Sequence, residues 1–268
     1  MLALISLIIF GILQGLTEFL PVSSSGHLSV FQYFSSSIND NLSLNIAVHL
    51  GTLLTVCVYY RSDLKEILVG LFRWDRHAVH MSFSIVVASI PTGIIGLMMK
   101  KNAESILTNP YVSGVCLLIT AIMLFLSDKI SIKENFQEGF GIPLSKAFII
   151  GIVQGFAVLP GISRSGSTII AGLMLGMNPR NASRFSFLIS LPAILGAGLL
   201  EFKDLNNSMD ISSFVIGGIT SFLVGLFAIS WMVKLTLKGN LKVFSYYLFA
   251  VAGLFLCCLA LGVGKGLI

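Results

Sequence analysis

The stretch QGLTEFLPVSSSGH, residues 14–27, and the stretch QGFAVLPGISRSGST, residues 154–168, decide how this chain must fold. Both are short polar strings inside otherwise apolar sequence, and they align with each other 140 residues apart. Each string holds one charge, Glu18 in the first and Arg164 in the second. Because ionised groups inside apolar segments are costly in a bilayer and usually mark a working site, these strings predict the functional centre.

The composition is that of an integral membrane protein. Of the 268 residues, 55% are hydrophobic and only 11% are charged, and the mean hydropathy is +0.92, whereas soluble domains carry about 25% charged residues. The net charge of +5 does not indicate a nucleic-acid partner, because Lys and Arg lie between the apolar runs, where membrane topology places them. The expected partners are membrane lipids. The alternating pattern of a transmembrane barrel is absent, so helices are predicted.

Six apolar runs suit membrane-crossing helices, which need about 20 residues. They cover residues 44–60, 79–99, 111–127, 185–200, 211–233 and 243–264. The two polar strings are predicted to form re-entrant helical hairpins, which enter and leave the membrane on the same side. The predicted fold class is therefore an all-α integral membrane protein with one polytopic domain, residues 1–268. Its first repeat covers about residues 1–127 and its second about residues 146–264.

The distribution of Lys and Arg favours this layout. With hairpins, twelve of the 17 basic residues fall on one side, four fall on the other, and Arg164 lies within a hairpin. If each string were one full span, the division would be about nine against seven, which is hardly a bias. The twelve-residue side is predicted to be cytoplasmic, and residues 61–79 are expected to form a loop there. Lys129 and Lys133 belong to that side, and the outer four are Lys100, Lys101, Lys203 and Lys265.

The two hairpins are predicted to enter from opposite faces, the first from the outer side and the second from the inner side. Opposite entry is typical of an inverted-topology repeat, whose site lies where the repeats meet. Pro21 and Pro160 are expected to end their helices, and Gly26, Gly161 and Gly166 to permit the turns that follow. Residues 140 positions apart are therefore expected to share one site.

The first string carries residues that suit a metal ion and a nucleophile. Gln14 and Glu18 are four residues apart and share one helix face, and their oxygens suit a hard cation such as Mg²⁺ or Ca²⁺, completed by substrate oxygens and waters. A serine activated by a histidine, or the imidazole itself, can attack phosphorus. Ser24 and His27 both stay open as the nucleophile. The hydroxyl cluster beside this histidine consists of Ser23, Ser24 and Ser25, of which Ser23 and Ser25 are predicted to bind substrate.

The second string carries residues that suit a phosphate group. Arg164 is a planar cation whose donors match phosphate oxygens. The backbone amides of the turn that begins at Gly161 are expected to form an anion nest. The hydroxyls predicted to bind substrate around the arginine are those of Ser163, Ser165 and Thr168. A purely structural pairing of Arg164 with Glu18 would not require this hydroxyl cluster, so phosphoryl chemistry is the favoured interpretation.

The two strings resemble the signature motifs of the undecaprenyl pyrophosphate phosphatase family, also called the bacitracin-resistance protein family. Gln14, Glu18, Ser24 and His27 match its first motif. Its second motif, PGxSRSxxT, matches residues 160–168. The resemblance implies a metal-dependent enzyme of the bacterial inner membrane. Such an enzyme removes the terminal phosphate of undecaprenyl pyrophosphate, recycles the lipid carrier for peptidoglycan synthesis, and has a site open to the outer side.

One departure from the family motif concerns the metal. Many relatives carry a glutamate where this chain has Gln14. The glutamine can ligate through its carbonyl oxygen but brings no charge, so the resemblance does not predict a two-carboxylate metal site here.

Two other classes of protein compete with this interpretation. The Ser-Gly-His element is also similar to type-2 phosphatidic acid phosphatases, which need a basic residue before an Arg-Pro and a histidine six places after their Ser-Arg arginine. Here nothing basic precedes Arg61, and the second position is Ile170, so that family is excluded. A transporter or flippase for a polyprenyl phosphate lipid stays the alternative, because inverted repeats with broken helices are typical of transporters.

Small residues in the 211–233 run bear on oligomeric state. Gly217, Gly218 and Ser221 are compatible with a close helix contact. That contact suits packing within one chain as well as a homodimer, so both stay open.

Overall fold

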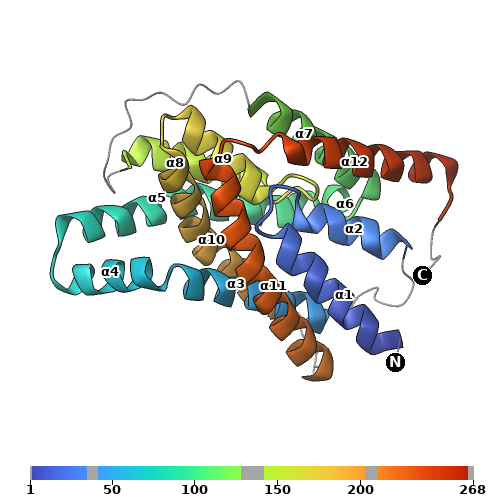
Figure 1. The fold of residues 1–268 in the computed structure, drawn as a ribbon, viewed down its shortest axis with the longest axis horizontal. Helices are drawn as coiled ribbons and strands as arrows, with labels where there is room; N and C mark the ends of the chain where they lie inside the picture. The colour runs from blue at the N-terminus through green and yellow to red at the C-terminus, as the bar shows by residue number, and fades with distance from the viewer. Residues whose placement is uncertain (1, 35–41, 128–141, 203–210, 265–268) are drawn as a thin grey trace.

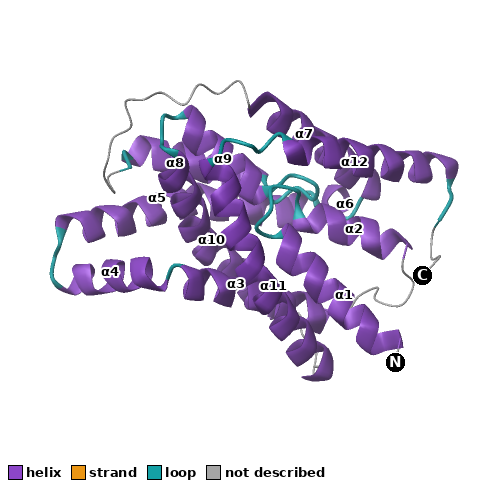
Figure 2. Cartoon of the chain, viewed as in Figure 1, coloured by secondary structure: helices purple, strands orange, loops and turns teal. Residues whose placement is uncertain are grey.

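The computed structural model describes residues 2–34, 42–127, 142–202 and 211–264, and in these ranges all regular structure is helical (Figures 1 and 2). The helices are α1 (Leu2–Thr17), α2 (Ser24–Phe34), α3 (Leu42–Tyr59), α4 (Arg61–Phe72), α5 (Arg76–Asn102), α6 (Glu104–Leu107), α7 (Pro110–Ser127), α8 (Leu144–Phe156), α9 (Arg164–Met174), α10 (Pro179–Phe202), α11 (Ile211–Leu237) and α12 (Val243–Leu261).

The six predicted membrane spans are confirmed. Helices α3, α5, α7, α10, α11 and α12 are long and apolar enough to cross a bilayer. Helix α5 starts earlier than its apolar run predicts, because Asp75 caps it. The Asp75 Oδ1 atom accepts the backbone N–H groups of His77 and Ala78, each at 3.0 Å, which satisfies donors that the first turn leaves unpaired.

The segment 61–79, expected to be a loop, is mostly helical. Helix α4 occupies its first part, and Arg184 of α10 forms an ion pair with Asp63 of α4. In Figure 1 the turn between α4 and α5 lies at the left, opposite the outer ends of α1 and α12 at the right. Four basic residues used in the topology prediction lie outside the described residues: Lys129, Lys133, Lys203 and Lys265.

The two polar strings form two helix–turn–helix pairs, α1 with α2 and α8 with α9. Helix α1 has 16 residues and α8 has 13, so at about 1.5 Å per residue they extend for roughly 24 Å and 20 Å. The hydrocarbon core is about 30 Å thick. Neither helix is therefore long enough to cross it upright. In both pairs, a short irregular turn follows the first helix.

Each helix pair packs on a long helix from the other half of the chain. Helix α1 packs on α11, and α8 packs on α5. Glycines make the approach close. A Cβ atom at Gly15 would lie 2.7 Å from the carbonyl oxygen of Ser221, and one at Gly151 would lie 2.1 Å from that of Ala88. Small residues are the usual way for helix backbones to approach closely in membranes, so the two halves interdigitate.

The small residues Gly217, Gly218 and Ser221 form a close helix contact within one chain. They face α3, where a Cβ atom at Gly217 would lie 2.4 Å from the Leu44 side chain. The Ser221 hydroxyl is fully buried and donates to the carbonyl oxygen of Val48 at 2.9 Å. This segment therefore gives no support to a homodimer, which stays a prediction.

Candidate active site

The first loop, residues 18–23, joins α1 to α2. Pro21 has no backbone N–H, so the helical hydrogen bonding of α1 cannot continue through it. The loop ends at Ser23, whose φ of 69° is left-handed and uncommon for an L residue. The hydroxyl oxygen of this serine accepts the backbone N–H of Gly26 at 3.2 Å and so caps α2. The turn is thus stabilised by its own side chain.

The second loop, residues 157–163, joins α8 to α9 and turns at Gly161. The φ of Gly161 is 98°, and a Cβ atom there would lie 2.3 Å from the carbonyl oxygen of Ser113. Only glycine suits this position, because both the backbone angle and the available space exclude a side chain. Thr120 of α7 fixes the loop by donating to the Gly161 carbonyl at 2.7 Å and accepting the N–H of Ser163 at 3.1 Å.

The same local hydrogen bonds occur in both loops at the 140-residue offset. In each, the first serine caps the following helix by accepting the N–H of a glycine three residues later. Its hydroxyl also contacts the hydroxyl of the serine two residues later. The caps pair Ser23 with Gly26 at 3.2 Å and Ser163 with Gly166 at 3.1 Å, and the hydroxyl contacts join Ser23 to Ser25 and Ser163 to Ser165, each at 3.3 Å. The matching sequence positions therefore have matching local geometry.

The two loops contact each other near the centre of the molecule, as the teal turns of Figure 2 show. The Ser23 hydroxyl accepts the backbone N–H of Gly161 at 3.2 Å. The Ser165 hydroxyl donates to the carbonyl oxygen of Leu20 at 3.2 Å. Residues far apart in sequence are thus brought into one cluster.

A buried ion pair lies where the loops meet. Arg164 Nη2 pairs with Glu18 Oε1, and the two side chains are only 14% and 9% exposed. The other carboxylate oxygen, Oε2, accepts hydrogen bonds from the Ser24 hydroxyl at 2.6 Å and from Gln14 Nε2 at 3.1 Å. The acid of the first string therefore binds the arginine of the second and the serine predicted as a nucleophile.

Two atoms of this cluster are buried without a protein partner among the described residues. They are Arg164 Nη1, a charged donor, and Gln14 Oε1, an acceptor. Buried polar groups in native structures are nearly always hydrogen-bonded, so these two atoms are the ones at this cluster with capacity to bind a substrate or an ion. The donor suits an anion such as a phosphate oxygen.

The His27 ring is held on both of its nitrogens. Nδ1 lies 2.8 Å from the carbonyl oxygen of Ser23, and Nε2 lies 2.8 Å from the hydroxyl of Tyr247 on α12. The ring is 5% exposed and stacks on the tyrosine ring at a 7° interplanar angle. Ser24 therefore has Glu18, not the histidine, as its hydrogen-bond acceptor.

Thr168 lies one turn after Arg164, but its hydroxyl has protein partners. It donates to the Arg164 carbonyl at 2.8 Å and lies 2.6 Å from the hydroxyl of Ser186 on α10. It joins α9 to α10. The structure gathers the other predicted site residues at the meeting of the two loops: Gln14, Glu18, Ser23, Ser24, Ser25, His27, Gly161, Ser163, Arg164 and Ser165.

The protein oxygens at the site fit a cation only in part. In the described part of the chain, no three His, Cys, Asp or Glu side chains are grouped to hold a metal ion. Among the described residues Gln14 Oε1 has no hydrogen-bond partner, and the Glu18 carboxylate of the same cluster accepts from Gln14 Nε2 and Ser24. Mg²⁺ is usually bound through one or two carboxylates together with substrate phosphates. The residues therefore fit a metal that arrives with, or is completed by, a phosphorylated substrate.

Three residues of the site have no counterpart among the sequence predictions. Thr120, Ser186 and Tyr247 lie on α7, α10 and α12, inside ordinary apolar spans. A single Thr, Ser or Tyr in such a span carries no signal of its own. Only the rotation of the helices, which the sequence does not give, brings these hydroxyls to the loops.

The fold and the site together define a class: a polytopic helical membrane protein with a buried arginine, carboxylate and serine cluster between two broken helix pairs. Residues 7–254 match the family described as Bacitracin resistance protein BacA. The chain belongs to this family.

Curated relatives cover nearly the whole chain. A protein of Methanococcus vannielii is 42% identical over 248 residues, which is 92% of this chain and 97% of the relative. Proteins of Thermosipho melanesiensis and Halothermothrix orenii are each 39% identical over 90% and 91% of this chain, and over 93% of their own lengths. All three relatives are described as undecaprenyl-diphosphatase.

Proposed function

We propose that this chain hydrolyses undecaprenyl diphosphate to undecaprenyl phosphate and inorganic phosphate, which recycles the lipid carrier. The relatives are named for this activity over nearly the full length. The observation that carries the proposal is the buried Nη1 of Arg164, unpaired in the part of the chain that the structure describes, in the cluster that holds the Ser24–Glu18 hydrogen bond. A donor for phosphate oxygens thus lies beside a hydroxyl whose proton acceptor is already in place.

Arg164 binds the terminal phosphoryl group. Its Nη1 is available, and its Nη2 can exchange Glu18 for a second phosphate oxygen, since guanidinium binds phosphate in bidentate fashion. This exchange also frees Glu18 from its cation. Glu18 Oε1 is then open to the proposed cation, while Oε2 still accepts the Ser24 hydroxyl.

Ser24 is the favoured nucleophile. Its hydroxyl donates to Glu18 at 2.6 Å, so the proton has an acceptor as Oγ attacks the terminal phosphorus. The bond between that phosphorus and the bridging oxygen breaks, and undecaprenyl phosphate leaves. Water then attacks the phosphoserine and releases phosphate and the free serine, with its proton passing to a base.

His27 is the candidate base for the water step, and the alternative nucleophile. Because Nδ1 faces a carbonyl oxygen, it must carry the proton, and a neutral ring then has its lone pair on Nε2. If Nε2 attacked instead, the intermediate would be a phosphohistidine. Phosphoserine is stable in acid whereas phosphohistidine is not, so the two routes differ chemically.

A divalent cation, Mg²⁺ or Ca²⁺, is proposed to bind at Gln14 and Glu18. Both residues offer oxygens at the site, and the substrate diphosphate would supply the rest of the ligand set. When bound, such an ion neutralises charge on the diphosphate.

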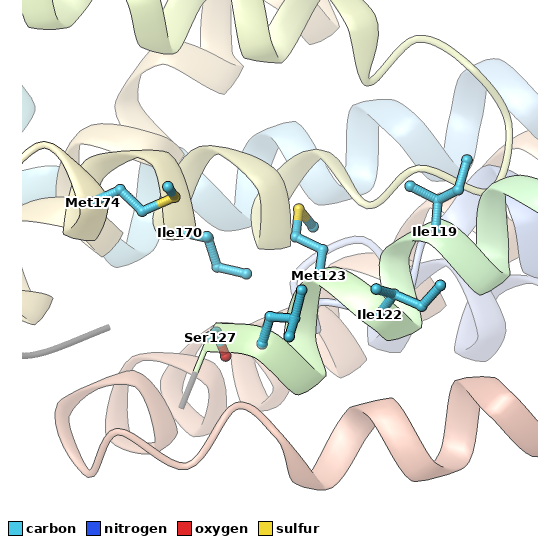
Figure 3. A pocket seen from close by; sticks show the side chains of 7 residues that line it. Ile119, Ile122, Met123, Ser127, Ile170 and Met174 are labelled. Carbon is cyan, nitrogen blue, oxygen red and sulfur yellow. The ribbon is translucent and has the colours of Figure 1, made fainter. Parts of the chain in front are cut away.

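The polyprenyl tail is proposed to occupy an apolar pocket between α7 and α9 (Figure 3). The pocket has a volume of about 480 Å³ and is lined by two helices that also contribute to the site. Helix α9 starts at Arg164 and reaches the pocket at Ile170. Helix α7 holds the second loop through Thr120 and enters the pocket at the neighbouring Ile119. The lining residues are Ile119, Ile122, Met123, Leu126, Ser127, Ile170 and Met174.

The proposed topology places the protein in the cytoplasmic membrane with the basic α4–α5 turn inside. It rests on the excess of Lys and Arg on that side. The short lengths of α1 and α8 support re-entrant pairs, and the matching local geometry of the two loops supports an inverted repeat. In this layout the first pair enters from the outer side, where the site would open.

The purified chain in detergent, supplied with undecaprenyl diphosphate, tests the proposed function. Release of phosphate that stops on addition of EDTA and returns with Mg²⁺ is the expected result. Release that EDTA leaves unchanged would contradict the metal proposal alone. No release, together with movement of the lipid across liposomes, would contradict the phosphatase and favour a flippase.

A further inference from the structure

Tyr247 contacts the candidate site from a helix that neither motif includes. It lies on α12, and its hydroxyl is 2.8 Å from Nε2 of His27. The two rings are stacked, with centroids 5.6 Å apart and planes 7° from parallel. The Tyr247 side chain thus holds the plane of the imidazole and also provides the hydrogen-bond partner of Nε2.

The hydrogen bonds of His27 define which form of the ring is held. A carbonyl oxygen only accepts, so the Nδ1 facing Ser23 must be the donor. In the neutral ring Nε2 is then an acceptor, and the Tyr247 hydroxyl donates to it. When Nε2 takes up a proton, it takes the one carried by the Tyr247 hydroxyl, this hydroxyl takes the proton that the reacting water releases, and the new Nε2–H donates to the tyrosine oxygen. Tyr247 therefore partners this buried nitrogen before and after it takes up a proton.

We propose that Tyr247 is a positioning residue for the phosphatase reaction, which acts by holding His27 in the Nδ1–H form with Nε2 at a fixed place. The proposal rests on the proposed function, because His27 matters only if it accepts a proton during the reaction. Proton transfer depends on such alignment, since a base must lie within hydrogen-bond reach of the proton it takes.

The variant Tyr247→Phe keeps the stacked ring and removes only the hydroxyl. Tyr246→Phe is the matched control, because Tyr246 is the preceding residue of α12 and its ring instead contacts Phe125, with centroids 6.3 Å apart. We expect Tyr247→Phe to lower kcat about tenfold, the effect of one lost hydrogen bond, and to leave KM within about twofold. Tyr246→Phe should change neither.

A second measurement reports the protonation form of His27 directly, through the ¹⁵N signals of its ring. The chain has four histidines, so protein labelled with ¹⁵N-histidine gives few imidazole signals, and His27→Gln assigns those of His27. We expect Nε2 of His27 to resonate as a hydrogen-bonded, unprotonated nitrogen, and this signal to shift in Tyr247→Phe but not in Tyr246→Phe.

An unchanged kcat in Tyr247→Phe, or a lower kcat with unchanged His27 signals, would overturn the proposal. So would a rise in KM at unchanged kcat, because it would show a role in substrate binding. If the wild type releases no phosphate, the proposed function fails, and the ¹⁵N signals still show whether Tyr247 sets the form of His27.

Discussion

The two terminal nitrogens of the Arg164 guanidinium group differ in their surroundings. Nη2 pairs with Glu18, whereas Nη1 is buried and unpaired among the described residues. A structural ion pair alone would not leave a charged donor unsatisfied, because burying such a group without a partner costs about 1–3 kcal/mol or more. The unpaired nitrogen therefore supports the proposed phosphate-binding role of Arg164.

The variant Arg164→Lys tests this distinction. Lysine keeps the charge and can still pair with Glu18, but it lacks the planar fork that also binds phosphate. We expect kcat/KM to fall by about 100-fold, which corresponds to roughly 2.7 kcal/mol of lost charge-assisted hydrogen bonding. Arg76→Lys, at an exposed residue of α5, is the control and should leave kcat/KM unchanged. Near-normal kcat/KM in Arg164→Lys would show that charge alone suffices.

Ser24 and His27 can be distinguished by the intermediate each would form. Rapid acid quenching of the enzyme with substrate labelled in its terminal phosphate should leave label on the protein, stable in acid and absent from Ser24→Ala. The reason is the hydrogen bond of Ser24 to Glu18, which makes its oxygen the better activated nucleophile. Label that is lost in acid but stable in alkali, and absent from His27→Gln, would identify His27 instead.

At the scale of elements, the loop after α8 depends on a glycine. Alanine at Gly161 would be strained by the φ of 98° and would place Cβ 2.3 Å from the Ser113 carbonyl oxygen. Gly176 has a similar φ of 81° but open space around its Cβ position. The two glycines therefore separate backbone strain from steric exclusion.

We expect Gly176→Ala to cost about 1–2 kcal/mol of stability, the cost of a left-handed alanine, and to retain activity. Gly161→Ala should cost clearly more and abolish phosphate release, because the loop that positions Arg164 must move. The apparent melting temperature in detergent and the phosphate assay measure the two effects. Equal melting temperatures for the two variants would show that the loop tolerates the added methyl group.

If the pocket between α7 and α9 holds the tail, KM should depend on the length of the prenyl chain. Filling it by Ile170→Trp should raise KM for undecaprenyl diphosphate by about tenfold, since roughly 1.4 kcal/mol of apolar burial is lost. KM for a short prenyl diphosphate should change little, because a short tail does not reach the pocket. Leu254→Trp, at a residue 68% exposed on α12, is the control. An equal rise in KM for both substrates would contradict the assignment of the pocket to the tail.

At the scale of the whole molecule, the sequence predicted the spans and the two broken helix pairs, because hydropathy and run length decide both. It also predicted that the two strings, with Glu18 and Arg164, would share one site, and the ion pair between these residues agrees with that prediction. The sequence did not indicate that α4 is a helix, because its first turn is polar and the segment is too short for a span. Nor did it indicate Thr120 or Tyr247, since these depend on how each long helix is rotated against the loops.

Interdigitation explains why one site requires both halves of the chain. Helix α1 packs on α11 and α8 packs on α5, so each loop is supported by helices from the other half. The first helix pair supplies the carboxylate and the serine, and the second pair supplies the arginine. If this division is correct, residues of the two loops act in the same chemical step.

A double-mutant cycle for phosphate release tests this central claim most directly. Ser24→Ala and Arg164→Ala should each lower kcat/KM for undecaprenyl diphosphate by about 10³-fold. The kcat/KM of the double variant should be only slightly below that of the less active single variant, because residues that act as a unit are strongly non-additive. Arg76→Ala combined with Ser24→Ala is the control and should add nothing. Losses that multiply, so that the double variant shows no detectable release while both single variants do, would contradict one site built from both loops.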